Sequence, residues 1–95
     1  MSETSIRRND DGGRYELSID GEIAGYAEFR QRPGEIIVTH TQTLRAYKGQ
    51  GVATRLTEWL LADARERGER VVPKCPFLVE YLETHHEFDD IIDRG

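Results

Sequence analysis

Two glycines, two positions apart, stand between a strand-like run of residues and a helix-like run. Gly49 and Gly51 follow Lys48, and apolar residues at helical spacing begin directly after them. Glycine lets the backbone approach a ligand closely, and the first amides of a helix have no partners within the helix. These amides lie at the positive end of the helix dipole, which favours phosphate. The segment therefore indicates either a phosphate or pyrophosphate site, or a turn in which glycine serves only the geometry.

Two well-known phosphate-binding motifs do not fit this segment. A Walker loop needs two glycines separated by four residues and then Lys followed by Ser or Thr, and no lysine stands at that position. The dinucleotide fingerprint G-x-G-x-x-G has Thr54 where its third glycine belongs. That fingerprint also opens a βαβ unit, whereas hairpins are predicted to link the strands before this loop. Both motifs are excluded.

Cys75 and His40 are two further side chains that could take part in chemistry. Cys75 is predicted at the junction of a strand and a helix, beside Lys74, where the helix dipole and the cation favour a thiolate. It could accept an acyl group, act as an acid toward a leaving group, or be a small buried core residue. His40 could be a general base or proton relay, or a packed residue on the strand face of Ile36 and Val38.

The elements that must position these groups are predicted from the periodicity of the apolar residues. Strand patterns occur at 14–19, 23–30 and 35–41, with a possible short strand at 6–8; helical spacing runs from 52 to 67 and from 77 to 85, with a short strand between them. This order predicts a layered α+β fold, an antiparallel β-meander followed by helix, strand and helix. Residues 1–13 are expected to be a flexible segment before a single domain of residues 14–95.

Length and composition exclude several classes of protein. The chain has 95 residues and a net charge of −5, so that one small domain is expected and general nucleic-acid binding is not. It contains no apolar run that could cross a bilayer and no apolar block of a secretory signal near its start. One cysteine and three histidines form neither an internal disulfide nor a convincing metal site. A cytoplasmic protein without a metal, either a monomer or a weak dimer, is expected.

The segment Lys48–Ala53 resembles the R/Q-x-x-G-x-G/A pyrophosphate loop of the GNAT superfamily of acetyl-CoA-dependent N-acetyltransferases. The predicted order of elements agrees with a GNAT-like fold. His40-Thr41 at the end of a strand and the segment Val72–Phe77 followed by Tyr81 are similar to the minimal YjdJ-type branch of that superfamily. The resemblance covers about residues 14–92. Lys stands where Arg is usual at position 48, and Thr43-Leu44 replaces a more typical Val-Pro.

This resemblance implies that the chain transfers an acetyl group from acetyl-CoA to a primary amine of a small molecule or protein. The implied pyrophosphate-binding residues are Lys48, Gly49, Gln50, Gly51, Val52, Ala53 and Thr54, and those along the pantetheine arm are Gln42, Thr43 and Leu44. Cys75 and His40 match positions proposed as catalytic in that branch. Larger members often use a tyrosine on the C-terminal helix to protonate the leaving thiolate, but Tyr81 falls in the apolar stripe of its helix, which favours core packing.

The short chain leaves little to enclose an acceptor, so two alternatives stay open. The protein could bind CoA or acyl-CoA without catalysis, or it could be a protein-interaction module that retains only the fold. Acidic residues gather near the end of the chain, at Glu83, Glu87, Asp89, Asp90 and Asp93. They form either a solvated face or a surface that attracts a cationic amine.

Overall fold

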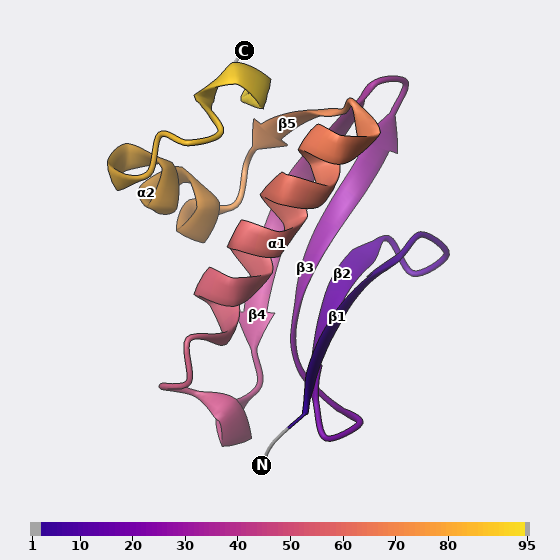
Figure 1. The fold of residues 1–95 in the computed structure, drawn as a ribbon, viewed down its shortest axis with the longest axis vertical. Helices are drawn as coiled ribbons and strands as arrows, with labels where there is room; N and C mark the ends of the chain where they lie inside the picture. The colour runs from indigo at the N-terminus through magenta and orange to yellow at the C-terminus, as the bar shows by residue number, and fades with distance from the viewer. Residues whose placement is uncertain (1–2, 95) are drawn as a thin grey trace.

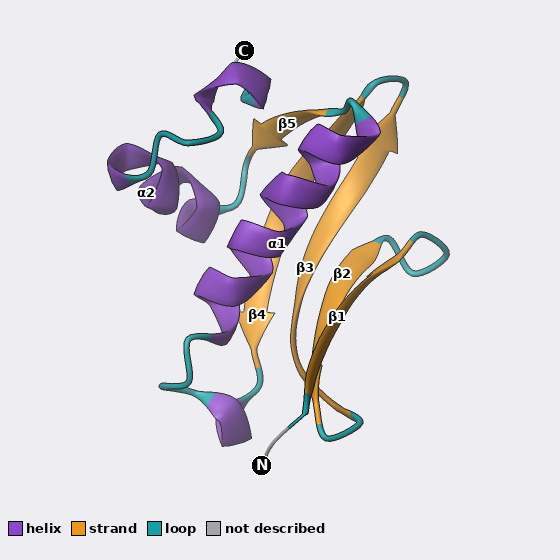
Figure 2. Ribbon diagram, in the orientation of Figure 1, coloured by secondary structure: helices purple, strands orange, loops and turns teal. Residues whose placement is uncertain are grey.

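A five-stranded sheet with two helices forms the fold of this chain in a computed structural model that describes residues 3–94 (Figure 1). The strands are β1 (Thr4–Asn9), β2 (Arg14–Ile19), β3 (Glu22–Arg32), β4 (Glu35–Thr43) and β5 (Arg70–Pro73). The helices are α1 (Val52–Arg67) and α2 (Pro76–Thr84), with 3-10 turns at Arg45–Tyr47 and Asp89–Ile91. The first four strands form an antiparallel meander, and α1 carries the chain over to β5, which lies parallel to β4 (Figure 2). The predicted α+β order of elements is confirmed.

The N-terminal strand β1 corrects the expectation of a flexible segment before the domain. Residues 4–9 pair with β2 along their whole length, from Thr4 opposite Ile19 to Asn9 opposite Arg14. The Arg8 side chain anchors this edge strand to the rest of the fold, because its guanidinium donates a hydrogen bond to the buried Glu69 carboxylate. The described part of the N-terminal segment therefore belongs to the sheet, whereas Met1 and Ser2 lie outside the described residues.

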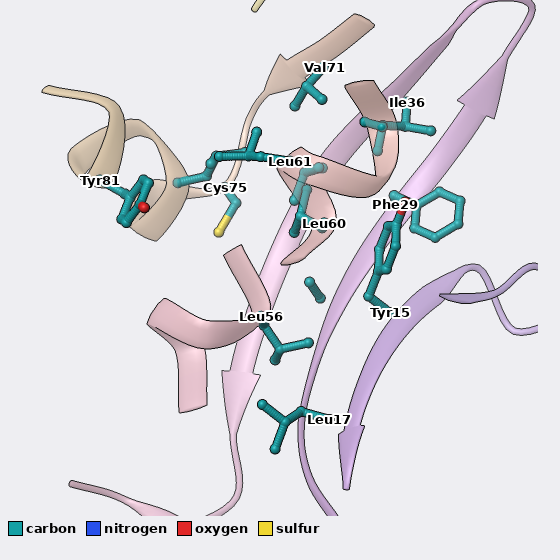
Figure 3. Close-up of a cluster of buried hydrophobic side chains, with 14 of the residues drawn as sticks. Tyr15, Leu17, Phe29, Ile36, Leu56, Leu60, Leu61, Val71, Cys75 and Tyr81 are labelled. Atoms are coloured by element: carbon teal, nitrogen blue, oxygen red, sulfur yellow. The ribbon is translucent and has the colours of Figure 1, made fainter. Parts of the chain in front are cut away.

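One buried cluster joins both helices to a single face of the sheet (Figure 3). Its largest fully buried side chains come from β2, β4, α1, β5 and α2 and include Tyr15, Leu17, Ile36, Leu56, Leu60, Leu61, Val71, Leu78 and Leu82. The opposite face, which we call the open face, carries Arg14, Glu16, Tyr26 and His40. There the Arg14 guanidinium lies 4.6 Å from the centroid of the Tyr26 ring. Apolar residues that alternate in the strands thus build one core layer.

A β-bulge in β4 decides which side chains face the helices. Glu28 is paired with His40 and Phe29 with Val38, so that Thr39 has no partner residue in the register. An extra residue reverses the alternation of the strand from that point on. Thr41 therefore faces the helices, and His40 lies on the open face. The prediction that His40 shares the face of Ile36 and Val38 is wrong for this reason.

Close approach of α1 to β3 depends on a glycine. A Cβ atom built on Gly25 would lie 2.6 Å from Val52 Cγ1 and 2.8 Å from the Gln42 carbonyl oxygen. Atoms cannot remain that close, so any larger residue would push the first turn of α1 away from the sheet. Gly25 thus fixes where the N-terminus of α1 lies.

Gly25→Ala is expected to destabilise the protein by about 1–3 kcal/mol, because the added methyl group overpacks this contact. Urea unfolding followed by circular dichroism measures the loss. Gly12→Ala is the matched control, since the nearest atoms to its Cβ belong to a side chain, that of Asn9, and not to the backbone, and it is expected to cost less. Equal losses in the two variants would contradict the role of Gly25.

The Glu16 carboxylate on the open face is held by three donors. Arg14 Nε lies 2.8 Å, Arg7 Nε 3.0 Å and Asn9 Nδ2 3.3 Å from its oxygens. Burial by itself would raise the pKa of Glu16, but the hydrogen bonds from Arg14, Asn9 and Arg7 outweigh it and hold the pKa below the ordinary value.

This lowered pKa makes stability depend on pH. A carboxyl whose folded pKa is lowered stabilises the fold above its unfolded pKa, and this stabilisation is lost as the pH falls through the folded pKa. We expect the free energy of unfolding to decrease below pH 4.5, the ordinary value for this group. Glu16→Gln should flatten that decrease in urea unfolding measured from neutral to acidic pH. An unchanged slope in the variant would show that Glu16 contributes nothing to it.

Candidate functional site

A cleft of about 490 Å³ lies where the end of β4 meets the first turns of α1 and α2. Figure 1 shows how these three elements are arranged. It is lined by Thr41, Thr43, Lys48, Gly49, Gly51, Val52, Ala53, Thr54 and Phe77. Seven of these residues belong to the set that the sequence indicated for cofactor binding. The structure therefore gathers most of that predicted set around one opening.

The loop from β4 to α1 is tied to the β2–β3 hairpin. The Leu44 amide donates to the Ala24 carbonyl at 2.8 Å, and the Tyr47 amide donates to the Leu44 carbonyl at 2.9 Å. The Tyr47 hydroxyl donates to a Glu22 carboxylate oxygen at 2.9 Å, a bond that raises the pKa of Tyr47. Sequence reasoning missed both side chains of this anchor, because they are 25 residues apart and no local pattern links them.

The N-terminus of α1 presents free donors to the cleft. Gly51 has a φ of 69° in the left-handed region, and the Arg55 amide donates the helix's first bond to the Gly51 carbonyl at 3.0 Å. The amides of Val52, Ala53 and Thr54 precede that bond, so they have no partners within the helix. The first turn of α1 carries no acidic residue. Amide dipoles and the nearby Lys48 thus suit a phosphate group.

A free strand edge continues the cleft. Of β4, only residues 35–38 pair with β5, and the last backbone hydrogen bond between the two segments is from the Lys74 amide to the Val38 carbonyl, at 3.0 Å. Beyond that point the chain turns into α2, while β4 continues to Thr43 with only β3 beside it. A strand edge without a neighbour offers amide and carbonyl groups to an extended partner. An extended ligand with amide groups fits this edge.

The structure does not bring Cys75 and His40 together. Cys75 is 1% exposed, and its thiol donates to Thr41 Oγ1 at 3.2 Å. His40 is exposed on the open face, where its Nε2 lies 3.3 Å from Gln42 Oε1 and its ring centroid 6.4 Å from that of Tyr26. Only Cys75 contacts a residue of the cleft wall, through Thr41. The two side chains flank the end of the β4–β5 pairing from opposite faces of the sheet.

Three residues of the predicted cofactor set are not among those that line the cleft. Gln42 points to the open face and donates through Nε2 to the Thr43 carbonyl at 3.1 Å, and Leu44 and Gln50 are exposed. Two residues outside the predicted set, Thr41 and Phe77, also line the cleft. Thr41 could have been found from the strand alternation, because it stands two positions before Thr43. The exposure of Phe77 could not have been predicted, because Phe77 falls at the helical spacing of the core residues in its segment.

Among residues 3–94, no group of three or more His, Cys, Asp or Glu side chains is arranged to hold a metal ion. No helix in the same range is long and apolar enough to span a membrane.

Two solved structures are similar to this chain in fold. The solution structure of a GCN5-like N-acetyltransferase candidate from Staphylococcus aureus superposes with a TM-score of 0.73 at 23% identity, covering 98% of this chain and 91% of that one. The crystal structure of ribosomal-protein-alanine N-acetyltransferase from Brucella melitensis biovar Abortus gives a TM-score of 0.55 at 20% identity, covering 86% of this chain and 61% of that one. At these identities the likeness concerns the fold.

The family of the chain follows from its match to a family model. Residues 14–91 match the model described as GCN5-related N-acetyl-transferase, which covers most of the chain. No curated protein matched the sequence. This match, over a chain that also has the sheet, the glycine loop and the cleft described above, shows that the chain belongs to the GCN5-related N-acetyltransferase family.

Proposed function

We propose that this protein transfers the acetyl group of acetyl-CoA to a primary amine of a small molecule or protein. The observation that carries the proposal is the continuity of the cleft with the free edge of β4. One end offers helix amides to a charged diphosphate, and the other offers strand groups to an extended arm. Acetyl-CoA combines these two chemistries in one molecule and supplies an activated thioester.

Each part of the cleft then has a role. The amides of Gly51, Val52, Ala53 and Thr54, with the Lys48 ammonium, bind the pyrophosphate. Gly49 lets the loop approach it, because a Cβ at that position would project into open space. Residues 42–44 lie along the pantetheine arm. Because the Leu44 amide is bonded to the Ala24 carbonyl, the backbone groups of Thr43, which alternate with it, pair with the arm and orient the thioester, which lowers the entropic part of the barrier.

We assign proton transfer to the two side chains at the end of the β4–β5 pairing. The Cys75 thiol holds a proton beside Thr41 Oγ1, and Thr41 lines the cleft, so that a proton can be delivered toward a leaving thiolate. His40 lies on the open face, outside the cleft, so it takes up the proton of the attacking amine through solvent at the free edge of β4. Acyl transfer through Cys75 itself is the other route open to this thiol.

Acetyl-CoA titration followed by amide chemical shifts is the test. Shifts are expected at residues 49–54 and along 41–44, together with release of CoA thiol when an amine is present. If millimolar acetyl-CoA does not shift the amide signals of residues 49–54, the proposal is rejected. Cys75→Ala should reduce kcat about 100-fold or more if the thiol carries a proton or an acetyl group. Unchanged turnover would make Cys75 a core residue only.

Binding of CoA without catalysis is the second candidate function. The positions of the two candidate catalytic side chains favour this second function, because neither His40 nor Cys75 is among the residues that line the cleft. Under this alternative acetyl-CoA shifts the same amides, but no amine in a panel is acetylated. The two measurements above separate the candidates.

A further inference from the structure

A second groove runs along α2 beside the cleft. It has a volume of about 340 Å³ and is lined by Phe77, Glu80, Tyr81, Glu83 and Thr84. Phe77, which is 37% exposed, also lines the cleft, so the two cavities share one side chain as a wall. The volume lies in the range of small-molecule sites. The groove therefore extends the cleft by a space large enough for a small ligand.

The groove carries negative charge that the described residues do not neutralise. Neither Glu80 nor Glu83 makes an ion pair within residues 3–94. Burial, followed by the carboxylates of Glu58 and Glu87, raises the pKa of Tyr81. The buried Glu16 and Glu69 carboxylates, by contrast, are each bonded by arginine. The potential around the groove suits a cation.

Tyr81 provides an independent observation that points to a ligand. Its side chain lies in the core cluster with only 8% of the residue exposed, and within residues 3–94 its hydroxyl makes no hydrogen bond. No fully buried oxygen or nitrogen of a described side chain lacks a partner, so the Tyr81 hydroxyl reaches solvent, and Tyr81 is one of the residues that line the groove. The Tyr81 ring stacks on the His85 ring, with centroids 3.9 Å apart and planes 4° apart, and this stacking fixes the orientation of the Tyr81 side chain. Figure 3 shows Tyr81 on α2. A hydroxyl without a protein partner at the wall of a groove can bond a ligand there.

We propose that the α2 groove binds an acceptor that carries a second ammonium group, that is, an aliphatic diamine or polyamine. This inference rests on the proposed function and names its substrate class. The carboxylates of Glu80 and Glu83 hold the ammonium, and the Tyr81 hydroxyl accepts a hydrogen bond from it. The other amine, in its neutral form, reaches past Phe77 into the cleft.

The experiment compares spermidine with n-butylamine, which has one amine only, in the presence of CoA. Binding is followed by amide shifts of the whole protein. Spermidine is expected to shift residues 77–84 and to bind at least tenfold more tightly than n-butylamine. Glu80→Gln/Glu83→Gln should weaken spermidine at least tenfold and leave n-butylamine unchanged. Glu66→Gln, an exposed carboxylate on α1 outside both cavities, is the charge control and should bind spermidine like the parent.

Several results would overturn the inference. Equal spermidine affinity in the double variant and the parent would show that the groove carboxylates do not bind it. Displacement of spermidine by adenosine 3′,5′-bisphosphate would assign the groove to the nucleotide instead. The acetyl-CoA titration is scored separately at residues 49–54. Normal shifts there without spermidine binding reject only the acceptor class, whereas no shifts there reject the proposed function itself.

Discussion

Replacing Gly51 by valine is expected to weaken acetyl-CoA binding about 100-fold while the rest of the fold persists. Gly51 has a φ of 69°, a conformation that a β-branched residue adopts only with strain. Relief of that strain would turn the amides that follow away from the cleft. Loss of two charge-assisted hydrogen bonds, at roughly 1.5 kcal/mol each, corresponds to about this factor.

Isothermal titration with acetyl-CoA measures the effect, and Gly34→Val is the matched control. Gly34 has a φ of 77° and equally open surroundings, but it lies in the β3–β4 turn away from the cleft. Both variants carry the same kind of backbone strain, so only a local role of the loop separates them. Equal affinities for acetyl-CoA would show that the Gly51 loop does not hold the pyrophosphate.

Arg8→Ala is expected to have the largest effect on stability, about 3–5 kcal/mol, because it leaves a buried carboxylate without its cation. The Arg8 side chain is 2% exposed, and its guanidinium lies 2.6 Å from Glu69 Oε1 and 4.8 Å from the centroid of the Phe29 ring. Glu69 would keep only the bond from Gln31 Nε2, at 2.8 Å. A single surface ion pair contributes far less.

Urea unfolding measures this loss, with Arg67→Ala as the control. Arg67 pairs with Asp63 at 2.8 Å, but its side chain is 45% exposed, so about 0–1 kcal/mol is expected. Should Arg8→Ala fail to fold, the double variant Arg8→Met/Glu69→Gln provides the comparison, since it removes both charges and should recover much of the stability. An Arg8→Ala variant as stable as Arg67→Ala would contradict the role of this pair.

The glycine loop that lines the cleft could be predicted from the sequence because its signals are local. Glycines at 49 and 51, a lysine before them and helical spacing after them all fall within one short segment. The face of His40 could not be predicted. It depends on the bulge at Thr39, which is set by the pairing of β4 with β3 and leaves no mark in the alternation of residues.

Contacts between distant segments escaped prediction for the same reason. Arg8 and Glu69 are 61 residues apart, and each looks like an ordinary surface residue in its own segment. Gly25 resembles a glycine that merely interrupts a strand until Val52 is seen to pack on it. Such features arise from packing between elements, which periodicity within one element does not report.

The bulge at Thr39 also separates two sets of residues that can vary independently. Beyond it, Thr41 and Thr43 form the wall of the cleft, while His40 and Gln42 lie on the open face of the same strand. Substitutions at the second pair leave the wall made by the first pair unchanged. A scaffold of this kind can therefore diverge in what it meets on one side of a strand while it keeps the wall of the cleft on the other.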